Sequence, residues 1–196
     1  MPSHFYAYLG RMKLIRRWGL MHAVQPENDM EHALQVALIA HALALMGNAR
    51  YQRGADPEHV LALAVYHDAT EVMTGDLPTP VKYHSPELRE AYGRMEQEAA
   101  QRLVSLAPEE IREDYRPYLT PAQDDAHALV KAADRLAAYI KCLEERQAGN
   151  REFLAAEASI LKELQASSLP EVQDFLSECV PSFGMSLDEI SGEASI

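Results

Sequence analysis

Hydrophobic residues recur along most of this chain with the three- to four-residue spacing of amphipathic helices. The stretch MEHALQVALIAHALALM predicts a first long helix, with Asn28 or Asp29 as its N-cap and Gly47-Asn48 at its end. The apolar stripe of this helix consists of Leu34, Ala37, Leu38, His41 and Leu45.

Four further long helices are predicted downstream. Residues 57–74 form the second, because Pro57 suits a first helical position and Gly75 a helix end. The third is SPELREAYGRMEQEAAQRLVSLA, with Ser85 as its N-cap and Pro86 at its first position. The fourth is ALVKAADRLAAYIKCLEERQA, and the fifth spans residues 151–167.

The remaining segments predict short helices and one loop. We expect short helices at residues 4–17, 108–116 and 170–179. Residues 78–86 contain three prolines, which predicts a loop without regular structure. No alternating, β-rich pattern and no internal repeat stands out. The sequence therefore predicts an all-α fold, with one domain over residues 1–190 and a flexible C-terminal tail at 191–196.

Composition and charge narrow the classes of function. The 196 residues are 47% hydrophobic, which suffices for a substantial core, and the net charge of −12 argues against a nucleic-acid binder. The two cysteines, Cys142 and Cys179, lack the spacing of a zinc motif, and free thiols suit a reducing compartment. The N-terminus lacks a signal-peptide pattern, and no run of 18 apolar residues occurs. We expect a soluble, cytoplasmic protein without nucleic-acid or membrane partners.

Candidate chemistry gathers in the stretch YHDATEVMTGDLPTP. Within ten positions it carries His67, Asp68, Glu71 and Asp76. On one helix, the first three would lie on neighbouring parts of a single surface. Burial of an unpaired carboxylate is costly, so this density of acidic groups predicts a compensating cation.

His32 and Asp134 interrupt the apolar patterns of two other helices in the same way. Two imidazoles and two carboxylates form a mixed donor set that suits Mn, Fe, Co, Ni or Zn better than Ca or Mg alone. Four protein ligands would leave positions for water and substrate. Structural interpretations stay open, because a histidine at a helix start is often simply hydrogen-bonded or exposed, and Asp134 can pair with Lys131 or Arg135.

The order of these residues, a single His32, the His67-Asp68 pair and a distant Asp134, is similar to the signature of the HD-domain phosphohydrolases. Longer segments resemble, more specifically, the bacterial 5′-deoxynucleotidases of the YfbR type. These segments are RRWGLM, EHALQVALIAHALA, YHDATEVMTGDLPTPVKY, LVKAADRLAAYIKCLEE, AGNREFL and VPSFGMSLDEIS, spread over nearly the whole chain.

This resemblance implies a single HD-domain helical bundle that removes the 5′-phosphate from 2′-deoxyribonucleoside 5′-monophosphates. It also implies a homodimer and one divalent transition metal ion, Co²⁺ or Mn²⁺, with Cu²⁺, Zn²⁺, Ni²⁺ or Fe²⁺ as alternatives. The implied metal ligands are His32, His67, Asp68 and Asp134.

The resemblance further implies a role for individual residues. Glu71 would assist the attacking water, Arg17 would contact the phosphate and Trp18 the sugar, which makes Glu71 and Arg17 the implied catalytic residues. The implied substrate-binding residues are Arg17, Trp18, His32, Asp68, Asp76, Leu77, Pro78, Thr79 and Asp134. Since a phosphate monoester is a dianion at pH 7, an acidic protein needs local positive charge, and the metal and Arg17 would supply it.

The chain departs from the family pattern at three places. Met30 stands where a small polar residue is expected, Gly19 replaces a proline, and the segment TPAQDDAHALV before Asp134 is shorter. The role of that segment stays open.

Several alternative functions also stay open. One is an HD phosphohydrolase acting on a nucleoside triphosphate, cyclic nucleotide or alarmone. A non-catalytic nucleotide-binding HD module and a plain helical scaffold are the others. Few basic clusters favour a monophosphate, and no P-loop, GxSxG or HExxH motif supports another enzyme class.

Overall fold

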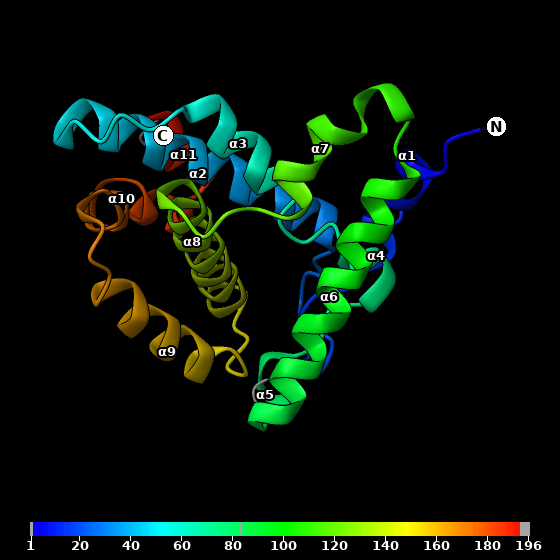
Figure 1. The fold of residues 1–196 in the computed structure, drawn as a ribbon. Coiled ribbons are helices and arrows are strands. Elements are labelled where there is room, and N and C mark those ends of the chain that lie inside the picture. The colour runs from blue at the N-terminus through cyan, green and yellow to red at the C-terminus, as the bar shows by residue number, and fades with distance from the viewer. Residues whose placement is uncertain (1, 83, 193–196) are drawn as a thin grey trace.

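The computed structural model describes residues 2–82 and 84–192, and every regular element within these ranges is a helix (Figure 1). Within these ranges, β-type pairing is limited to an isolated antiparallel bridge between Arg16 and Asn28. The prediction of an all-α fold is confirmed. In chain order the helices are α1 (Phe5–Leu9), the 3₁₀ helix η1 (Met12–Leu14), α2 (Asp29–Tyr51), α3 (Pro57–Val65), α4 (Glu71–Thr74), α5 (Thr79–Lys82), α6 (Pro86–Leu106), η2 (Glu109–Ile111), α7 (Arg112–Leu119), α8 (Asp125–Gln147), α9 (Leu154–Gln165), α10 (Pro170–Glu178), η3 (Val180–Gly184) and α11 (Leu187–Ser191).

The main core lies where α2, α3 and α8 pack together, with α9 and α10 against them (Figure 1). Leu43 of α2, Val60 of α3 and Leu136 of α8 are completely buried there. A smaller core lies among α1, α6 and α7 and includes Phe5 and Leu103. Together the two cores fix the start of α2, the end of α3 and the middle of α8 relative to one another.

The predicted stripe of α2 faces the core only at Ala37, which is buried. Leu34, Leu38 and Leu45 are 61%, 62% and 48% exposed, whereas Val36 and Leu43 are buried. Both faces of α2 carry apolar residues, so periodicity alone could not identify the inner one. By length and composition α2 could span a membrane, but half of its most apolar window is buried in the protein. This burial fits a core helix.

Side-chain caps begin α2 and α6 as expected. The carboxamide of Asn28 accepts hydrogen bonds from the backbone N–H of Met30 and of Glu31, and the Glu31 carboxylate accepts from the N–H of Asn28. This capping box fixes the first turn of α2. Ser85 caps α6, with Pro86 at its first position, as predicted.

Gly47 does not end α2, which continues to Tyr51 and stops at Gln52 in a left-handed conformation. A Cβ atom on Gly47 would lie 3.1 Å from Cγ of Arg53 and 3.3 Å from Oε1 of Glu171. Glycine at this position therefore lets the side chains of Arg53 and Glu171 pack closely against α2.

The predicted helix over residues 57–74 is interrupted. α3 ends at Val65, residues 66–70 form tight turns, and α4 begins at Glu71. Within the turns, backbone bonds join residues three apart, such as the N–H of Glu71 and the carbonyl of Asp68 at 2.9 Å. His67 and Asp68 therefore lie in a turn, where their side chains can both be directed to one point.

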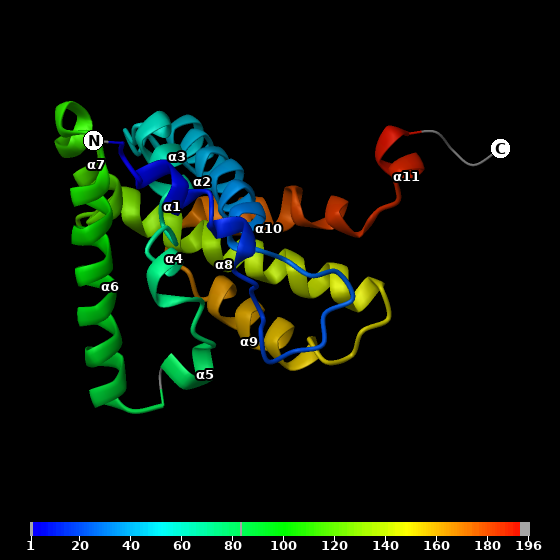
Figure 2. The same ribbon diagram turned by 90° about the vertical axis from the view of Figure 1, so that its right-hand side faces the viewer.

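Smaller corrections concern the other segments. The proline-rich loop contains the single helical turn α5, and α8 begins at Asp125, earlier than predicted. α11 follows an extended connection and projects away from the other helices (Figure 2). The boundary of the HD domain at residue 190 stays a prediction, and residues 193–196 of the expected tail lie outside the described residues.

Candidate active site

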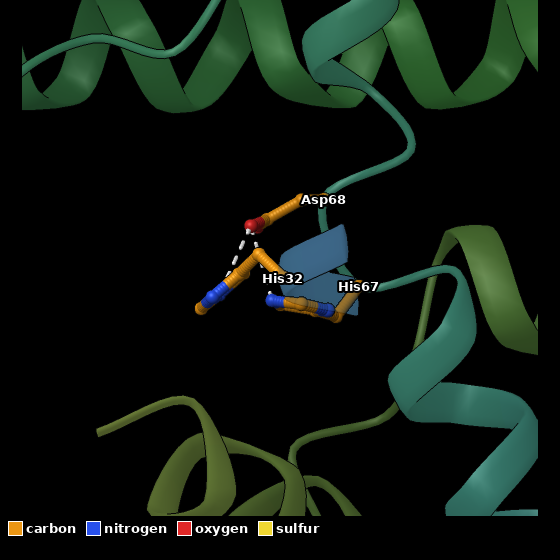
Figure 3. Close-up of side chains that lie close together, drawn as sticks. All are labelled: His32, His67 and Asp68. Carbon is orange, nitrogen blue, oxygen red and sulfur yellow. Dashed lines mark ion pairs between the residues drawn. The ribbon is translucent and has the colours of Figure 1, made fainter. Parts of the chain in front are cut away.

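Three of the four expected metal ligands meet beside the first turn of α2. His32 comes from α2, and His67 and Asp68 come from the turn after α3; one ligand atom of each lies within 4.8 Å of the others. Oδ2 of Asp68 is 3.0 Å from Nε2 of His67 and 3.8 Å from Nε2 of His32 (Figure 3). The carboxylate thus lies between the two imidazoles.

Asp134, from α8, joins the same cluster. Its Oδ1 lies 3.0 Å from Nε2 of His32. The two imidazole Nε2 atoms and the two aspartates therefore converge from three separate segments, and the structure brings together all four residues that the sequence singled out.

The second ring nitrogen of each histidine faces an acceptor outside the cluster. Nδ1 of His67 is 2.7 Å from the carbonyl oxygen of Ala64, and Nδ1 of His32 is 3.5 Å from Oε1 of Glu27. The carbonyl of Ala64 can only accept, so Nδ1 of His67 carries a proton, and the Nε2 atoms of both histidines face the cluster. Nε2 of His67 is buried and lies 3.0 Å from Oδ2 of Asp68, but no well-directed hydrogen bond satisfies it among the described residues. This donor set fits a divalent transition metal ion.

The electrostatics of the cluster favour a cation. Burial would lower the pKa of His67, but the charges of Asp68 and Asp134 outweigh it and raise the pKa to about 9. Burial would likewise raise the pKa of Asp68, but His67 and Arg17 lower it well below the usual range. These shifts mean that the carboxylates of the cluster favour a positive charge beside them.

Arg17 extends into the cluster from the segment before α2. Its Nη1 lies 2.8 Å from Oδ2 of Asp68 and 3.8 Å from Oδ1 of Asp29, and its Nη2 lies 4.0 Å from Oδ1 of Asp134. Burial would lower the pKa of Arg17, but Asp68, Asp134 and Glu27 raise it above its ordinary value. A permanent positive charge is thus placed next to the candidate metal ligands.

Trp18 is half-buried beside Arg17. Its φ of 58° is left-handed, a conformation that costs a residue with a side chain about 1–2 kcal/mol. The indole N–H donates to Oε2 of Glu27 at 3.1 Å, and the ring packs on Phe153 with centroids 5.1 Å apart. Strained backbone of this kind concentrates at functional sites.

Glu71 opens α4, one turn after Asp68. Its Oε2 is buried without a hydrogen-bond partner among the described residues. Burial and the charges of Asp68, Asp29 and Asp76 raise its pKa to about 10. A cation in the cluster would oppose these charges and favour the carboxylate form.

The segment after Gly75 contains the remaining expected contacts. Burial raises the pKa of Asp76 and Arg17 opposes it, so this carboxylate interacts with the cluster. Leu77 and Pro78 are half-buried and Thr79 is exposed. They follow Asp76 directly along the chain, and their contact with a substrate stays a prediction.

Sequence reasoning missed two acidic residues. Glu27 bonds the Trp18 ring and faces His32, and Asp29 is completely buried with both oxygens lacking hydrogen-bond partners among the described residues. Burial and Asp68 raise the pKa of Asp29 to about 7. Acidic residues at a helix start have an ordinary capping explanation, so only the folded arrangement distinguishes these two.

Comparisons with known proteins identify the family of this chain. The family described as 5′-deoxynucleotidase YfbR-like matches residues 4–183. The chain is 50% identical to a 5′-deoxynucleotidase of Vibrio atlanticus over 191 residues, covering 96% of this chain and 98% of the relative. It is also 50% identical to a 5′-deoxynucleotidase of Erwinia tasmaniensis over 194 residues, covering 98% of both.

Solved structures share the fold. An HD-domain phosphohydrolase from Listeria innocua superposes with a TM-score of 0.80 at 22% identity, covering 97% of this chain and 98% of the other. The HD phosphohydrolase of cyanophage S-2L, bound to dA and one catalytic Zn²⁺ ion, superposes with a TM-score of 0.60 at 23% identity, covering 89% and 93%. On the family match and the near full-length identity to its relatives, this chain belongs to the YfbR-like 5′-deoxynucleotidase family.

Proposed function

We propose that this protein is a metal-dependent 5′-nucleotidase that hydrolyses 2′-deoxyribonucleoside 5′-monophosphates to the deoxyribonucleoside and phosphate. A water oxygen forms a bond to phosphorus while the bond from phosphorus to the 5′-oxygen breaks. The observation that carries the proposal is the adjacency of Arg17, at 2.8 Å from Asp68, to a cluster of two imidazoles and two carboxylates. Half-identical relatives named 5′-deoxynucleotidase support the substrate class.

His32, His67, Asp68 and Asp134 would hold one divalent ion, and Co²⁺ or Mn²⁺ are the ions we propose. Such an ion, when bound, supplies Lewis-acid polarisation of the phosphoryl group and a lowered pKa of a bound water. The hydrogen bond from Nδ1 of His67 to the carbonyl oxygen of Ala64 supports this role, because it leaves Nε2 as the ring nitrogen that would face the ion.

Arg17 would hold the phosphate. Its planar guanidinium suits two phosphate oxygens, and in this acidic chain it is the cation that lies against the cluster. The carboxylate of Glu71, directed to the same region, would orient the attacking water and accept its proton.

Trp18 would contact the sugar and leave no room for a 2′-hydroxyl. Its backbone strain, its bond to Glu27 and its packing on Phe153 support this role, since they hold a bulky ring in one orientation beside Arg17. Asp76, Leu77, Pro78 and Thr79 would line the remainder of the nucleotide pocket.

We further propose that two copies associate through the outer face of α2. Leu34, Leu38 and Leu45 are exposed at spacings of four and seven residues, which places them on one face of the helix, as in a helix–helix seam. The projecting α11, with Leu187 77% and Ile190 58% exposed, supplies a second apolar surface for a second copy of this chain. Sedimentation should give a dimer, and Leu38→Glu should give a monomer.

The free cysteines suit the reducing cytoplasm as the place of action.

Phosphate release tests the function. Protein stripped with chelator and reloaded with single metals is offered deoxyribonucleoside and ribonucleoside monophosphates, a deoxynucleoside triphosphate and a cyclic nucleotide. We expect metal-dependent release from the deoxyribonucleoside monophosphates above all. Preference for the triphosphate or cyclic nucleotide, or no release with any metal, would overturn the proposal.

A further inference from the structure

The segment Trp18–Glu27, here called the substrate loop, carries Trp18 yet contains no helix or strand. Two of its apolar side chains point outward, with Leu20 72% and Val24 57% exposed. Met21 and Ala23 touch the main core only in part. Burial of side chains therefore holds this loop weakly, and its position depends on other contacts.

Those contacts come from a buried ion pair on α8. Glu145 is 1% and Lys141 4% exposed, and Nζ of Lys141 donates to Oε1 of Glu145 at 2.6 Å. The Glu145 carboxylate also accepts from the backbone N–H of Val24 at 2.8 Å and of Gln25 at 3.1 Å. Lys141 donates to the carbonyl oxygen of Gln25 at 2.5 Å.

Asn150, just beyond the end of α8, completes the arrangement. Its Nδ2 donates to Oε2 of Glu145 at 2.8 Å and to the carbonyl oxygen of His22 at 2.7 Å. Within the described residues, the Glu145 carboxylate bonds either the loop backbone or Lys141 and Asn150, which themselves bond the loop backbone. The ion pair therefore acts on the loop, and in the part of the chain that the structure describes it makes no side-chain bond that joins two core helices.

The held part of the loop leads directly to Glu27, two residues after Gln25. Glu27 accepts the indole N–H of Trp18 at 3.1 Å and faces Nδ1 of His32 at 3.5 Å. Its carbonyl oxygen accepts the backbone N–H of Arg17 at 3.0 Å. A shift of the loop would therefore displace the indole that meets the sugar, whereas the guanidinium of Arg17 stays bonded to Asp68 at 2.8 Å.

We infer that Glu145, with Lys141, is a positioning residue for nucleotide recognition: it holds the substrate loop so that Trp18 keeps the orientation that selects the sugar. The inference rests on the proposed nucleotidase function. Stability alone is a weak explanation for this pair, because a buried ion pair often stabilises a fold no more than apolar residues of similar size. Its bonds to backbone groups instead specify one loop conformation.

Glu145→Gln tests the inference in the full-length, metal-loaded protein. The substitution keeps the size of the side chain but places an NH₂ group where N–H donors converge. Glu144→Gln is the matched control, because it removes the same charge from the neighbouring, exposed position of α8. Assays use 2′-deoxyadenosine 5′-monophosphate, adenosine 5′-monophosphate and phenyl phosphate, which lacks a sugar.

We expect Glu145→Gln to raise KM for the deoxynucleotide and to lower the preference for deoxy over ribo substrate, each by about tenfold. Metal content and kcat/KM for phenyl phosphate should stay near those of the control. Trp18 is the chain's one tryptophan, so acrylamide quenching of its fluorescence reports on the loop directly and should increase while the helical circular dichroism is unchanged.

Unchanged KM, selectivity and quenching in a folded Glu145→Gln protein would overturn the inference, even if its melting temperature fell. Wild-type protein without deoxynucleotidase activity would instead overturn the proposed function, while the quenching result would still decide whether Glu145 holds the loop. If Glu145→Gln does not fold, Asn150→Ala removes the bond to His22 and must show the same loss of selectivity and increase in quenching. Normal behaviour of Asn150→Ala would then count against the inference.

Discussion

Replacement of Arg17 by alanine should separate substrate binding from metal binding, because the two respond in opposite directions. Arg17 lies within 4.0 Å of carboxylate oxygens of Asp68, Asp29, Asp134 and Glu27. Without the guanidinium, the phosphate loses a charged hydrogen-bonding partner. At the same time the cluster gains net negative charge, which favours a metal cation.

The size of the first effect follows from the bonds that Arg17 can make. Hydrogen bonds to charged groups contribute about 1.5–3 kcal/mol, which corresponds to a loss of about 10- to 10²-fold in kcat/KM. Arg17→Lys should fall between wild type and Arg17→Ala, because it keeps the charge but loses the planar fork. Arg17→Ala should retain its metal against a chelator at least as well as wild type, because the added negative charge of the cluster attracts the cation.

Steady-state kinetics and elemental analysis of the same protein batches measure both effects. Arg16→Ala is the matched control, since Arg16 is exposed, adjacent and equally charged. Loss of metal together with activity in Arg17→Ala would mean that Arg17 maintains the cluster and does not bind phosphate. Unchanged kcat/KM would remove Arg17 from the substrate site altogether.

Four further outcomes are expected. Glu71→Ala should lower kcat by about 10²- to 10⁴-fold with metal content unchanged, and loss of metal would instead make Glu71 a ligand. His67→Ala and Asp134→Ala should each lower metal content in elemental analysis, so full occupancy in both would refute the four-ligand site. Trp18→Ala should raise kcat/KM for ribonucleotides relative to deoxyribonucleotides by about tenfold, or ~1.4 kcal/mol, and constant selectivity would make the ring purely structural. Burial would raise the pKa of Glu145, but Lys141 and the N–H donors lower it to about 2. The contribution of the carboxylate to stability is therefore complete above the unfolded pKa of about 4.3 and is lost as pH falls toward 2. In urea unfolding over that pH range, Glu145→Gln should lose less stability than wild type.

The helices could be predicted from the sequence because their capping and spacing are local. Asn28 and Ser85 bond groups within their own first turns, so the sequence alone contains the signal. The inner face of α2 is different. Leu38 and Leu43 are equally apolar, and only the positions of α3 and α8 decide that Leu43 is buried while Leu38 is exposed.

The interruption after α3 could not be predicted for a related reason. Residues 66–70 contain no proline or glycine, so nothing local ends the helix. The turn instead brings Nε2 of His67 and Oδ2 of Asp68 to 3.0 Å, a geometry that serves the cluster with His32. Here the requirements of the site outweigh helix propensity.

The candidate ligands were found because each interrupts an apolar pattern, whereas Glu27 and Asp29 lie in the short stretch QPEND and interrupt no such pattern. Their importance comes from the path of the substrate loop, which returns Glu27 to Trp18 and places Asp29 beside Arg17. The two ends of the loop meet only when the whole loop has folded back on itself, and no spacing rule in the sequence predicts such contacts.

α8 carries residues that contact both the His/Asp cluster and the substrate loop. Asp134, Lys141 and Glu145 are separated by seven and four residues, so they lie on one face of a helix, at rises of about 10 Å and a further ~6 Å. The first contacts the imidazole of His32, and the other two hold the backbone of the substrate loop. Because a single helix carries both, a rigid element sets the distance between the candidate metal ligands and the loop that carries the proposed sugar contact. Under the proposed function, a loop without regular structure can then hold Trp18 at a fixed distance from the cluster.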